Sequence, residues 1–213
     1  RLLEFIAKTK KPVILSTGAS DFEDIDFAIK FLNDNGCDDI TILQCTSKYP
    51  CPVNSLNLLT IPEIRERYNL PTGLSDHSEN PLLAPTVATA LGASVIEKHF
   101  TLDKNLPGPD HKFALSPNEL SLMITSIRNT EKSLGSGKKT ILDDEKELRQ
   151  FATRSLQAIK EIKKGEKLIE GFNFEVLRPG NKKRGLAGRY ILSVNNKTAT
   201  EDIQKGEGIT SFE

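Results

Sequence analysis

Several residue types are scarce in this sequence. It contains no tryptophan, one methionine, three cysteines and three histidines among 213 residues. Its 29 basic and 29 acidic side chains cancel, so no charge excess indicates binding to nucleic acid or to an anionic membrane. No apolar run approaches the roughly 20 residues of a membrane-spanning helix. At this length the chain has enough mass for one large domain, or for a medium and a small one.

The three cysteines, Cys37, Cys45 and Cys51, are odd in number and lack the spacing of a zinc ribbon. We therefore expect buried or half-buried thiols in the reducing cytoplasm. A reactive thiol is the alternative for Cys45 and Cys51, because both lie near the end of a predicted strand.

All three histidines, His77, His99 and His111, fall between positions 77 and 111. Histidine is the side chain that most readily binds a divalent metal or titrates near neutral pH. A chain this poor in histidine that places all of it in one stretch is expected to have a reactive site there.

Strands and helices alternate through the first two thirds of the sequence. Each predicted strand is an apolar run that ends in small polar residues, as a buried parallel strand does. Helix starts are indicated by acidic first turns and, at Ser116 and Glu119, by a capping box. The expected strands span 12–18, 40–45, 72–75 and 94–99, and the expected helices span 21–36, 61–68, 80–91 and 116–134. Four such units in series predict a parallel sheet of the α/β class.

Polar residues recur at the carboxyl ends of these strands, namely Ser16, Ser47, Ser75, His77 and His99. In a (β/α)8 barrel that rim is where active sites are built. An open doubly wound sheet also binds ligands there, but no glycine-rich dinucleotide loop follows any strand. The sequence therefore favours a barrel.

The pattern changes after a charged stretch at 142–150, which is expected to be a linker or a short helix. Short alternating segments at 155–160, 174–178 and 189–192 predict strands separated by tight turns. The sequences IKKGE at 162–166 and IQKGE at 203–207 are near repeats about 41 residues apart. We therefore expect a barrel-type domain at 1–140, a linker at 141–151 and a small, mostly β domain at 152–213.

Two imidazoles at neighbouring strand ends would suit Mn²⁺, Fe²⁺ or Zn²⁺ acting as a Lewis acid on a carbonyl. The alternative is that His77 and His99 are satisfied by hydrogen bonds at the strand ends. Asp110 could act as a catalytic residue that handles protons, could orient a sugar hydroxyl, or could simply fix its turn. Arg178 could reach a polar substrate, although a lone arginine in a turn is usually a solvated charge.

The rim hydroxyls suggest a small anionic substrate, because hydroxyls together with backbone N–H groups at helix starts bind phosphate. Taken one at a time, Ser16, Ser47 and Ser75 are more often cap or turn residues.

Several motifs together resemble the sialic acid synthases. They are STG at 16–18, LQCTSKYP at 43–50, GLSDH at 73–77, GASVIEKHFTLD at 92–103 and PGPDH at 107–111. That family condenses phosphoenolpyruvate with N-acetylmannosamine or a related amino sugar and makes nine-carbon sialic, legionaminic or pseudaminic acids. The tail, with IKKGE at 162–166 and LRPG at 177–180, resembles the antifreeze-like (SAF) domain that follows the barrel in these enzymes.

The resemblance implies a role for each matched residue. His77 and His99 would be the two protein ligands of a divalent metal, usually Mn²⁺, that activates the open-chain aldehyde of the sugar. The remaining roles are phosphoenolpyruvate binding by Ser16, Ser47 and Ser75, and amino-sugar binding by Tyr49 and Asp110. Arg178 would reach the active site of the other subunit in a domain-swapped homodimer.

The resemblance begins in the helix before the fifth strand of the family's barrel, so the chain corresponds to strands 5–8 and is expected to be truncated at its N-terminus. Four strands cannot close a barrel, so we expect these 213 residues alone not to catalyse the condensation. Two alternatives remain at this point. One is a 3-deoxy sugar acid synthase or aldolase-type barrel, which lacks the SAF-like tail. The other is a non-catalytic, carbohydrate-binding remnant.

Overall fold

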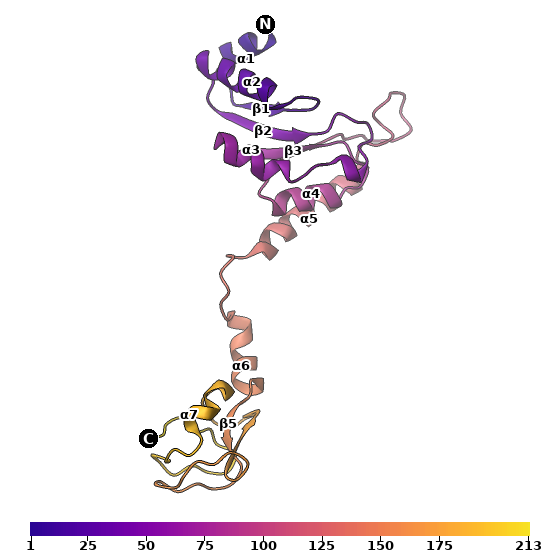
Figure 1. The fold of residues 1–213 in the computed structure, drawn as a ribbon. Helices are drawn as coiled ribbons and strands as arrows, with labels where there is room; N and C mark the ends of the chain where they lie inside the picture. Colours follow the sequence, from indigo (N-terminus) through magenta and orange to yellow (C-terminus); the bar gives the residue numbers. More distant parts are fainter. The chain divides into compact units, whose positions relative to one another are not determined.

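Four parallel strands form the central sheet of residues 1–137, the first of two compact units in a computed structural model that describes all residues 1–213 (Figure 1). The strand order follows the sequence, and each strand pairs in parallel with the next. The strands are β1 (Val13–Ser16), β2 (Ile40–Cys45), β3 (Thr72–Asp76) and β4 (Val95–Lys98). The predicted α/β class and parallel sheet are confirmed, and the curled sheet corresponds to half of a barrel.

Helices alternate with the strands of this sheet along the chain, as the sequence pattern predicts. They are α1 (Leu2–Lys8), α2 (Phe22–Asp34), α3 (Thr60–Tyr68), α4 (Leu83–Ala90) and α5 (Pro117–Leu134), with a short 3-10 turn, η1, at Val53–Ser55. The predicted capping box of α5 is present between Ser116 and Glu119. Helix α4 starts three residues later than predicted. The Asn80 side chain lies before the helix and accepts hydrogen bonds from the backbone N–H groups of Leu82 and Leu83.

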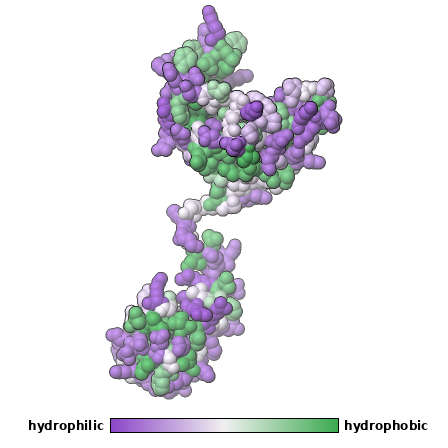
Figure 2. Space-filling view, turned by 45° about the vertical axis from the view of Figure 1, so that its right-hand side comes forward, coloured by the Kyte–Doolittle hydropathy of each residue, from purple (hydrophilic) through white to green (hydrophobic).

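The helical layer buries one face of the sheet. Ile25, Ile29 and Leu32 of α2 are buried together with Ile40 and Ile42 of β2. Side chains on a strand alternate between faces, and on β1 the alternate residue Ile14 is 56% exposed. Figure 2 shows apolar surface on both units of the chain. None of the helices is long and apolar enough to span a bilayer.

The second unit, Lys138–Glu213, contains a two-stranded antiparallel sheet of β5 (Ser155–Ala158) and β6 (Phe174–Leu177). The two near repeats pair with each other, because Ile162 and Ile203 exchange backbone hydrogen bonds of 2.9 and 2.8 Å. Equivalent bonds join Gly165 to Ala199 (2.8 Å) and Gly206 to Ala158 (2.7 Å). The repeats are therefore related by an approximate two-fold axis.

One predicted strand is wrong. Residues 189–192 are helical, within η3 (Gly188–Tyr190) and α7 (Ile191–Val194). This four-residue segment, with three apolar residues after Arg189, is too short for periodicity to distinguish a strand from a helix. Here the helical turn lets Ile191 and Val194, three residues apart, both pack on the core of the second unit, while Leu192 is 87% exposed.

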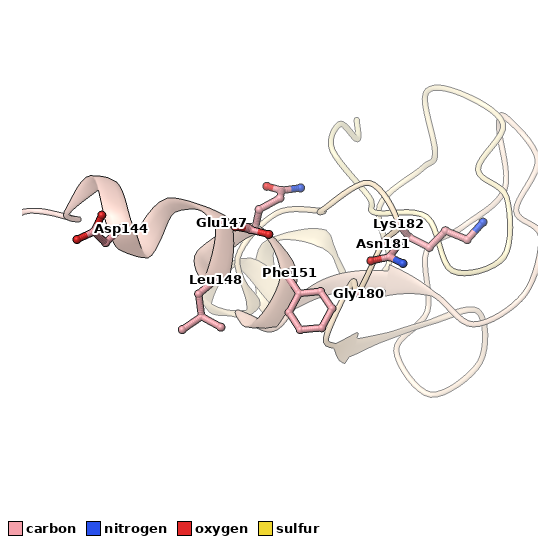
Figure 3. A pocket seen from close by; sticks show the side chains of 8 residues that line it. Asp144, Glu147, Leu148, Phe151, Gly180, Asn181 and Lys182 are labelled. Carbon is pink, nitrogen blue, oxygen red and sulfur yellow. The ribbon is translucent and has the colours of Figure 1, made fainter.

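The charged stretch before this core forms η2 (Asp143–Glu145) and α6 (Lys146–Ala152). Leu148 and Phe151 of α6 are more than half exposed. Both line an open hollow of about 640 Å³ that Gly180 and Lys182 also border (Figure 3). Of the two expectations for this stretch, a linker or a short helix, the structure shows a short helix.

Candidate functional site

His77 and His99 lie immediately beyond two neighbouring strands. Asp76, the last residue of β3, is the register partner of Lys98, the last residue of β4. The two histidines therefore leave the sheet side by side, and their ring centroids are 5.3 Å apart. The structure brings together the pair that the sequence suggested as metal ligands.

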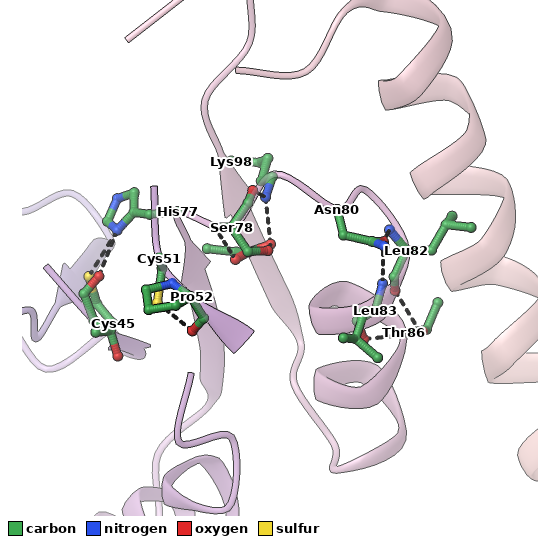
Figure 4. Close-up of polar contacts among 12 residues, drawn as sticks. Cys45, Cys51, Pro52, His77, Ser78, Asn80, Leu82, Leu83, Thr86 and Lys98 are labelled. Carbon is green, nitrogen blue, oxygen red and sulfur yellow. Dashed lines mark hydrogen bonds and ion pairs between the residues drawn. The ribbon is translucent and has the colours of Figure 1, made fainter. Parts of the chain in front are cut away.

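The ring of His77 has a defined hydrogen-bond partner on one side. Its Nδ1 lies 3.0 Å from the backbone carbonyl of Thr46 and 3.8 Å from the Cys45 thiol (Figure 4). A carbonyl oxygen only accepts, so we assign the proton of the neutral ring to Nδ1. Nε2 then carries the lone pair, which is the usual arrangement when one imidazole nitrogen is held by a carbonyl and the other binds a metal.

His99 is held mainly through its backbone and its ring faces. Its carbonyl accepts a 2.8 Å bond from the N–H of Leu115, and its ring centroid lies 5.0 Å from that of Phe113. Asp110 Oδ2 lies 3.9 Å from His99 Nδ1. Since Asp110 is half exposed, its carboxylate can turn toward either the histidine or a ligand.

These residues fit a divalent metal with open coordination positions. The structure contains no group of three or more histidine, cysteine, aspartate or glutamate side chains placed to hold a metal ion. Two imidazoles 5.3 Å apart are close enough to share one ion, because each metal–nitrogen bond spans about 2.0–2.1 Å. An ion held there would keep the remaining positions for a substrate or water.

Tyr49 forms an aromatic wall beside the histidines. Its ring centroid lies 4.2 Å from that of His77 and 6.0 Å from that of His99. Phe113, which is buried, lies 6.0 Å from Tyr49 and completes the wall. No sequence pattern marks Phe113 as a site residue, because it lies in a loop whose path along the sheet edge is not apparent from the sequence.

Ser75 and Glu97 form a polar pair on the same rim. Ser75 is buried and donates a 2.6 Å hydrogen bond to Glu97 Oε1. Glu97 is a further rim residue that the strand pattern of the sequence indicates. Residues two apart on a strand share a face, so Glu97 accompanies His99 just as Ser75 accompanies His77.

Ser16 and Ser47 lie exposed at the ends of β1 and β2. The loop after β1 and the loop after β2 contact each other closely. A Cβ atom added at Gly18 would lie only 2.1 Å from Ser47 Oγ. A hollow of about 480 Å³ opens at these strand ends and is lined by Thr17 and Ser47, among others.

Arg178 is exposed and lies just after β6, in the second unit.

The cysteines are free and buried, as predicted. Burial and the neighbouring Asp76 carboxylate raise the pKa of the Cys51 thiol. Because the thiolate is the nucleophile, a higher pKa makes Cys51 less reactive at neutral pH.

His111 belongs to the loop between β4 and α5. Its Nδ1 lies 2.7 Å from the Thr101 hydroxyl, which fixes the loop one residue after Asp110.

Lys104 on the loop between β4 and α5 pairs with Glu119 at 2.8 Å. Hydrogen bonds to Glu119 from the Lys104 ammonium and from the backbone N–H and hydroxyl of Ser116 lower the pKa of Glu119 to about 2 from its ordinary 4.5.

The Glu119 pair predicts a pH-dependent stability. A carboxylate whose pKa is lowered in the folded state stabilises the fold above its unfolded pKa and loses that contribution as pH falls. We expect the Glu119 contribution to disappear between about pH 4.5 and pH 2. Glu119→Gln should therefore flatten the dependence of the melting temperature on pH in this range. Glu131→Gln, which removes an exposed pair with Arg128 on the same helix, is the control, and an equal flattening there would contradict the assignment.

Comparison with known proteins identifies the relatives of this chain. Residues 1–139 match the model of the NeuB family. The chain is 46% identical over 207 residues to protein MJ1065 of Methanocaldococcus jannaschii, which covers 97% of this chain and 60% of that protein. It is 41% identical over 207 residues to N,N'-diacetyllegionaminic acid synthase of Campylobacter jejuni, covering 96% of this chain and 60% of that enzyme.

A solved structure agrees with this family. The N-acetylneuraminic acid (sialic acid) synthetase of Leptospira borgpetersenii superposes with a TM-score of 0.63 at 35% identity, over 69% of this chain and 51% of that one. The chain spans about 60% of the length of the curated relatives it matches. Because the family model matches residues 1–139, well over half of the chain, the chain belongs to the NeuB family.

Proposed function

We propose that this chain carries part of the active site of a sialic acid-type synthase, which condenses phosphoenolpyruvate with N-acetylmannosamine or a related amino sugar. The observation that carries the proposal is the pair His77 and His99, with ring centroids 5.3 Å apart on the sheet rim. The Campylobacter jejuni and Leptospira borgpetersenii relatives, named as synthases of sugar acids of this kind, support it.

The reaction forms one carbon–carbon bond and breaks one carbon–oxygen bond. C3 of phosphoenolpyruvate bonds to the aldehyde carbon of the open-chain sugar, water adds at C2, and the C2–O bond to phosphate breaks. The products are a nine-carbon 2-keto sugar acid and inorganic phosphate. A divalent metal, which we propose to be Mn²⁺ on His77 and His99, supplies Lewis-acid polarisation of the aldehyde when bound.

The other rim residues bind and orient the two substrates in this proposal. Ser16 and Ser47 supply hydroxyl donors to phosphoenolpyruvate, and Ser75 does so when its single O–H leaves the 2.6 Å bond to Glu97 Oε1. Tyr49 and Asp110 contact the amino sugar. Tyr49 suits this role because its ring lies 4.2 Å from that of His77 and yet is half exposed.

The second unit is proposed to be a SAF domain. The pairing of its two near repeats about an approximate two-fold axis, together with the LRPG segment at 177–180, supports this assignment. In a domain-swapped homodimer of the proposed kind, the exposed Arg178 would approach the site of the other subunit. The three free, buried thiols favour a reducing compartment, which we propose to be the cytoplasm.

A chimera tests the proposed activity. Residues 1–213 are joined to the portion of the Campylobacter jejuni synthase that this chain does not cover, and folding is checked by circular dichroism. We expect phosphate release that needs phosphoenolpyruvate, the amino sugar and Mn²⁺ together, while residues 1–213 alone release none. With phosphoenolpyruvate carrying ¹⁸O at the C2–O bridge, the released phosphate should contain the label.

Two results would count against these statements. A folded chimera that releases no phosphate, or only unlabelled phosphate, would contradict the proposed reaction. Robust phosphate release from residues 1–213 alone would contradict the expectation that this chain is inactive by itself.

A further inference from the structure

A buried ion pair lies directly beneath the two histidines. Lys98 Nζ is 2.6 Å from Asp76 Oδ2, and the two side chains are only 3% and 0% exposed. Lys98 also donates to the backbone carbonyl of Ser78 (Figure 4). Asp76 in turn accepts from the Ser78 N–H at 2.8 Å and from its hydroxyl at 3.1 Å.

This pair cannot serve as a substrate contact from where it lies. Successive side chains on a strand point to opposite faces, so Asp76 and Lys98 face away from the side on which Ser75 and Glu97 meet. Their burial keeps them from any ligand on the rim. Any role in the site must therefore act through the histidines that follow them.

The pair lies at the point where His77 leaves the sheet. Lys98 holds the residues on both sides of His77, the Asp76 side chain and the Ser78 carbonyl. Lys98 itself immediately precedes His99. One ammonium group thus ties the segment that carries one imidazole to the strand that carries the other.

We propose that Lys98 and Asp76 are positioning residues that fix the separation of His77 and His99, and so the metal affinity of the pair. This proposal rests on the proposed metal-binding function. A purely stabilising role is a poor explanation of the pair, because replacing a buried ion pair by well-packed apolar residues is often neutral or stabilising. A geometric role explains why both charges lie in register at the residues before the two ligands.

The test measures Mn²⁺ binding to the folded chain by electron paramagnetic resonance of the free ion. Lys98→Met should weaken binding by about 10- to 100-fold, as expected when a group that orients a metal ligand is lost. Lys98→Arg keeps the positive charge beside Asp76 and should therefore bind Mn²⁺ more tightly than Lys98→Met does. Lys104→Met removes the partly buried pair with Glu119 and should leave Mn²⁺ binding unchanged.

Lys98→Met leaves the Asp76 carboxylate buried without its opposite charge, with only the hydrogen bonds from Ser78 remaining, and this can prevent folding. The double variant Asp76→Asn, Lys98→Met removes both charges and provides the second test. It should fold and still bind Mn²⁺ at least about tenfold more weakly. Binding equal to the wild type in this folded variant would overturn the proposal.

A measurement without metal separates this proposal from the proposed function. In the metal-free chain, hydrogen exchange reports the bonds from His77 Nδ1 to the Thr46 carbonyl and from the Cys51 N–H to the His77 carbonyl. Both protons should exchange faster in the double variant than in the wild type. If Mn²⁺ binding survives His77→Ala, His99→Ala, the metal site is wrong, and unchanged exchange in the double variant would separately refute the positioning role.

Discussion

The double variant His77→Ala, His99→Ala is expected to lose Mn²⁺ binding by more than about 100-fold. Losing a residue that only orients a metal ligand costs about 10- to 100-fold in affinity, so removing both ligands should cost more. The two rings lie 5.3 Å apart, and no group of three potential ligand side chains exists elsewhere in the structure to replace them. Titration of the folded chain with Mn²⁺, followed by electron paramagnetic resonance, measures the effect.

His111→Ala is the matched control for this experiment. It removes the third histidine of the chain, whose Nδ1 contacts the Thr101 hydroxyl at 2.7 Å rather than the other two rings. Binding should be retained in this variant. Equal losses in His111→Ala and in the double variant would show that the binding is not specific to His77 and His99.

Phe174→Ala is expected to destabilise the second unit by about 3–5 kcal/mol, the usual cost of truncating a fully buried phenylalanine. Phe174 is 0% exposed and packs with Leu156, Leu168 and Ile209, among others, in the core of the unit. Because a domain is commonly stable by only about 5–15 kcal/mol, this loss is a large share of the total. Denaturant unfolding followed by far-ultraviolet circular dichroism measures it, since the chain contains no tryptophan.

Phe172→Ala provides the comparison two residues away. Phe172 is 60% exposed, and the Lys160 ammonium lies over its ring, 3.2 Å from the ring centroid. An exposed cation–π contact contributes about 0.5–1 kcal/mol, so this change should be nearly neutral. A loss as large as that of Phe174→Ala would mean that the buried cluster does not dominate the stability of the unit.

Much of the fold is predictable from local patterns. The four parallel strands follow from apolar runs that end in polar residues, and the capping box at Ser116 marks the start of α5. The helical turn at 189–194 is not predictable in this way. Its four apolar residues suit a strand or a helix equally, and only packing of Ile191 and Val194 on the second core decides between them.

The candidate site divides in a similar way. The sequence indicates that His77 and His99 follow neighbouring strands, and it places Ser75 close by. It does not indicate the Ser75–Glu97 hydrogen bond or the aromatic contact of Tyr49 with Phe113. These contacts join residues 22 and 64 positions apart, so they depend on strand register and on the path of a loop.

The sequence by itself determined which side chains of this chain can perform chemistry and on which strand ends they lie, because alternation and capping are local properties. The tertiary structure decided how those groups act together. The register of β3 against β4 brings Asp76 to Lys98 and His77 to His99. The loop after β2 supplies the Thr46 carbonyl, which accepts a hydrogen bond from Nδ1 of His77 and so fixes the position of the ring proton. Such contacts depend on the free energy of the whole packed sheet, which no single segment of the sequence encodes.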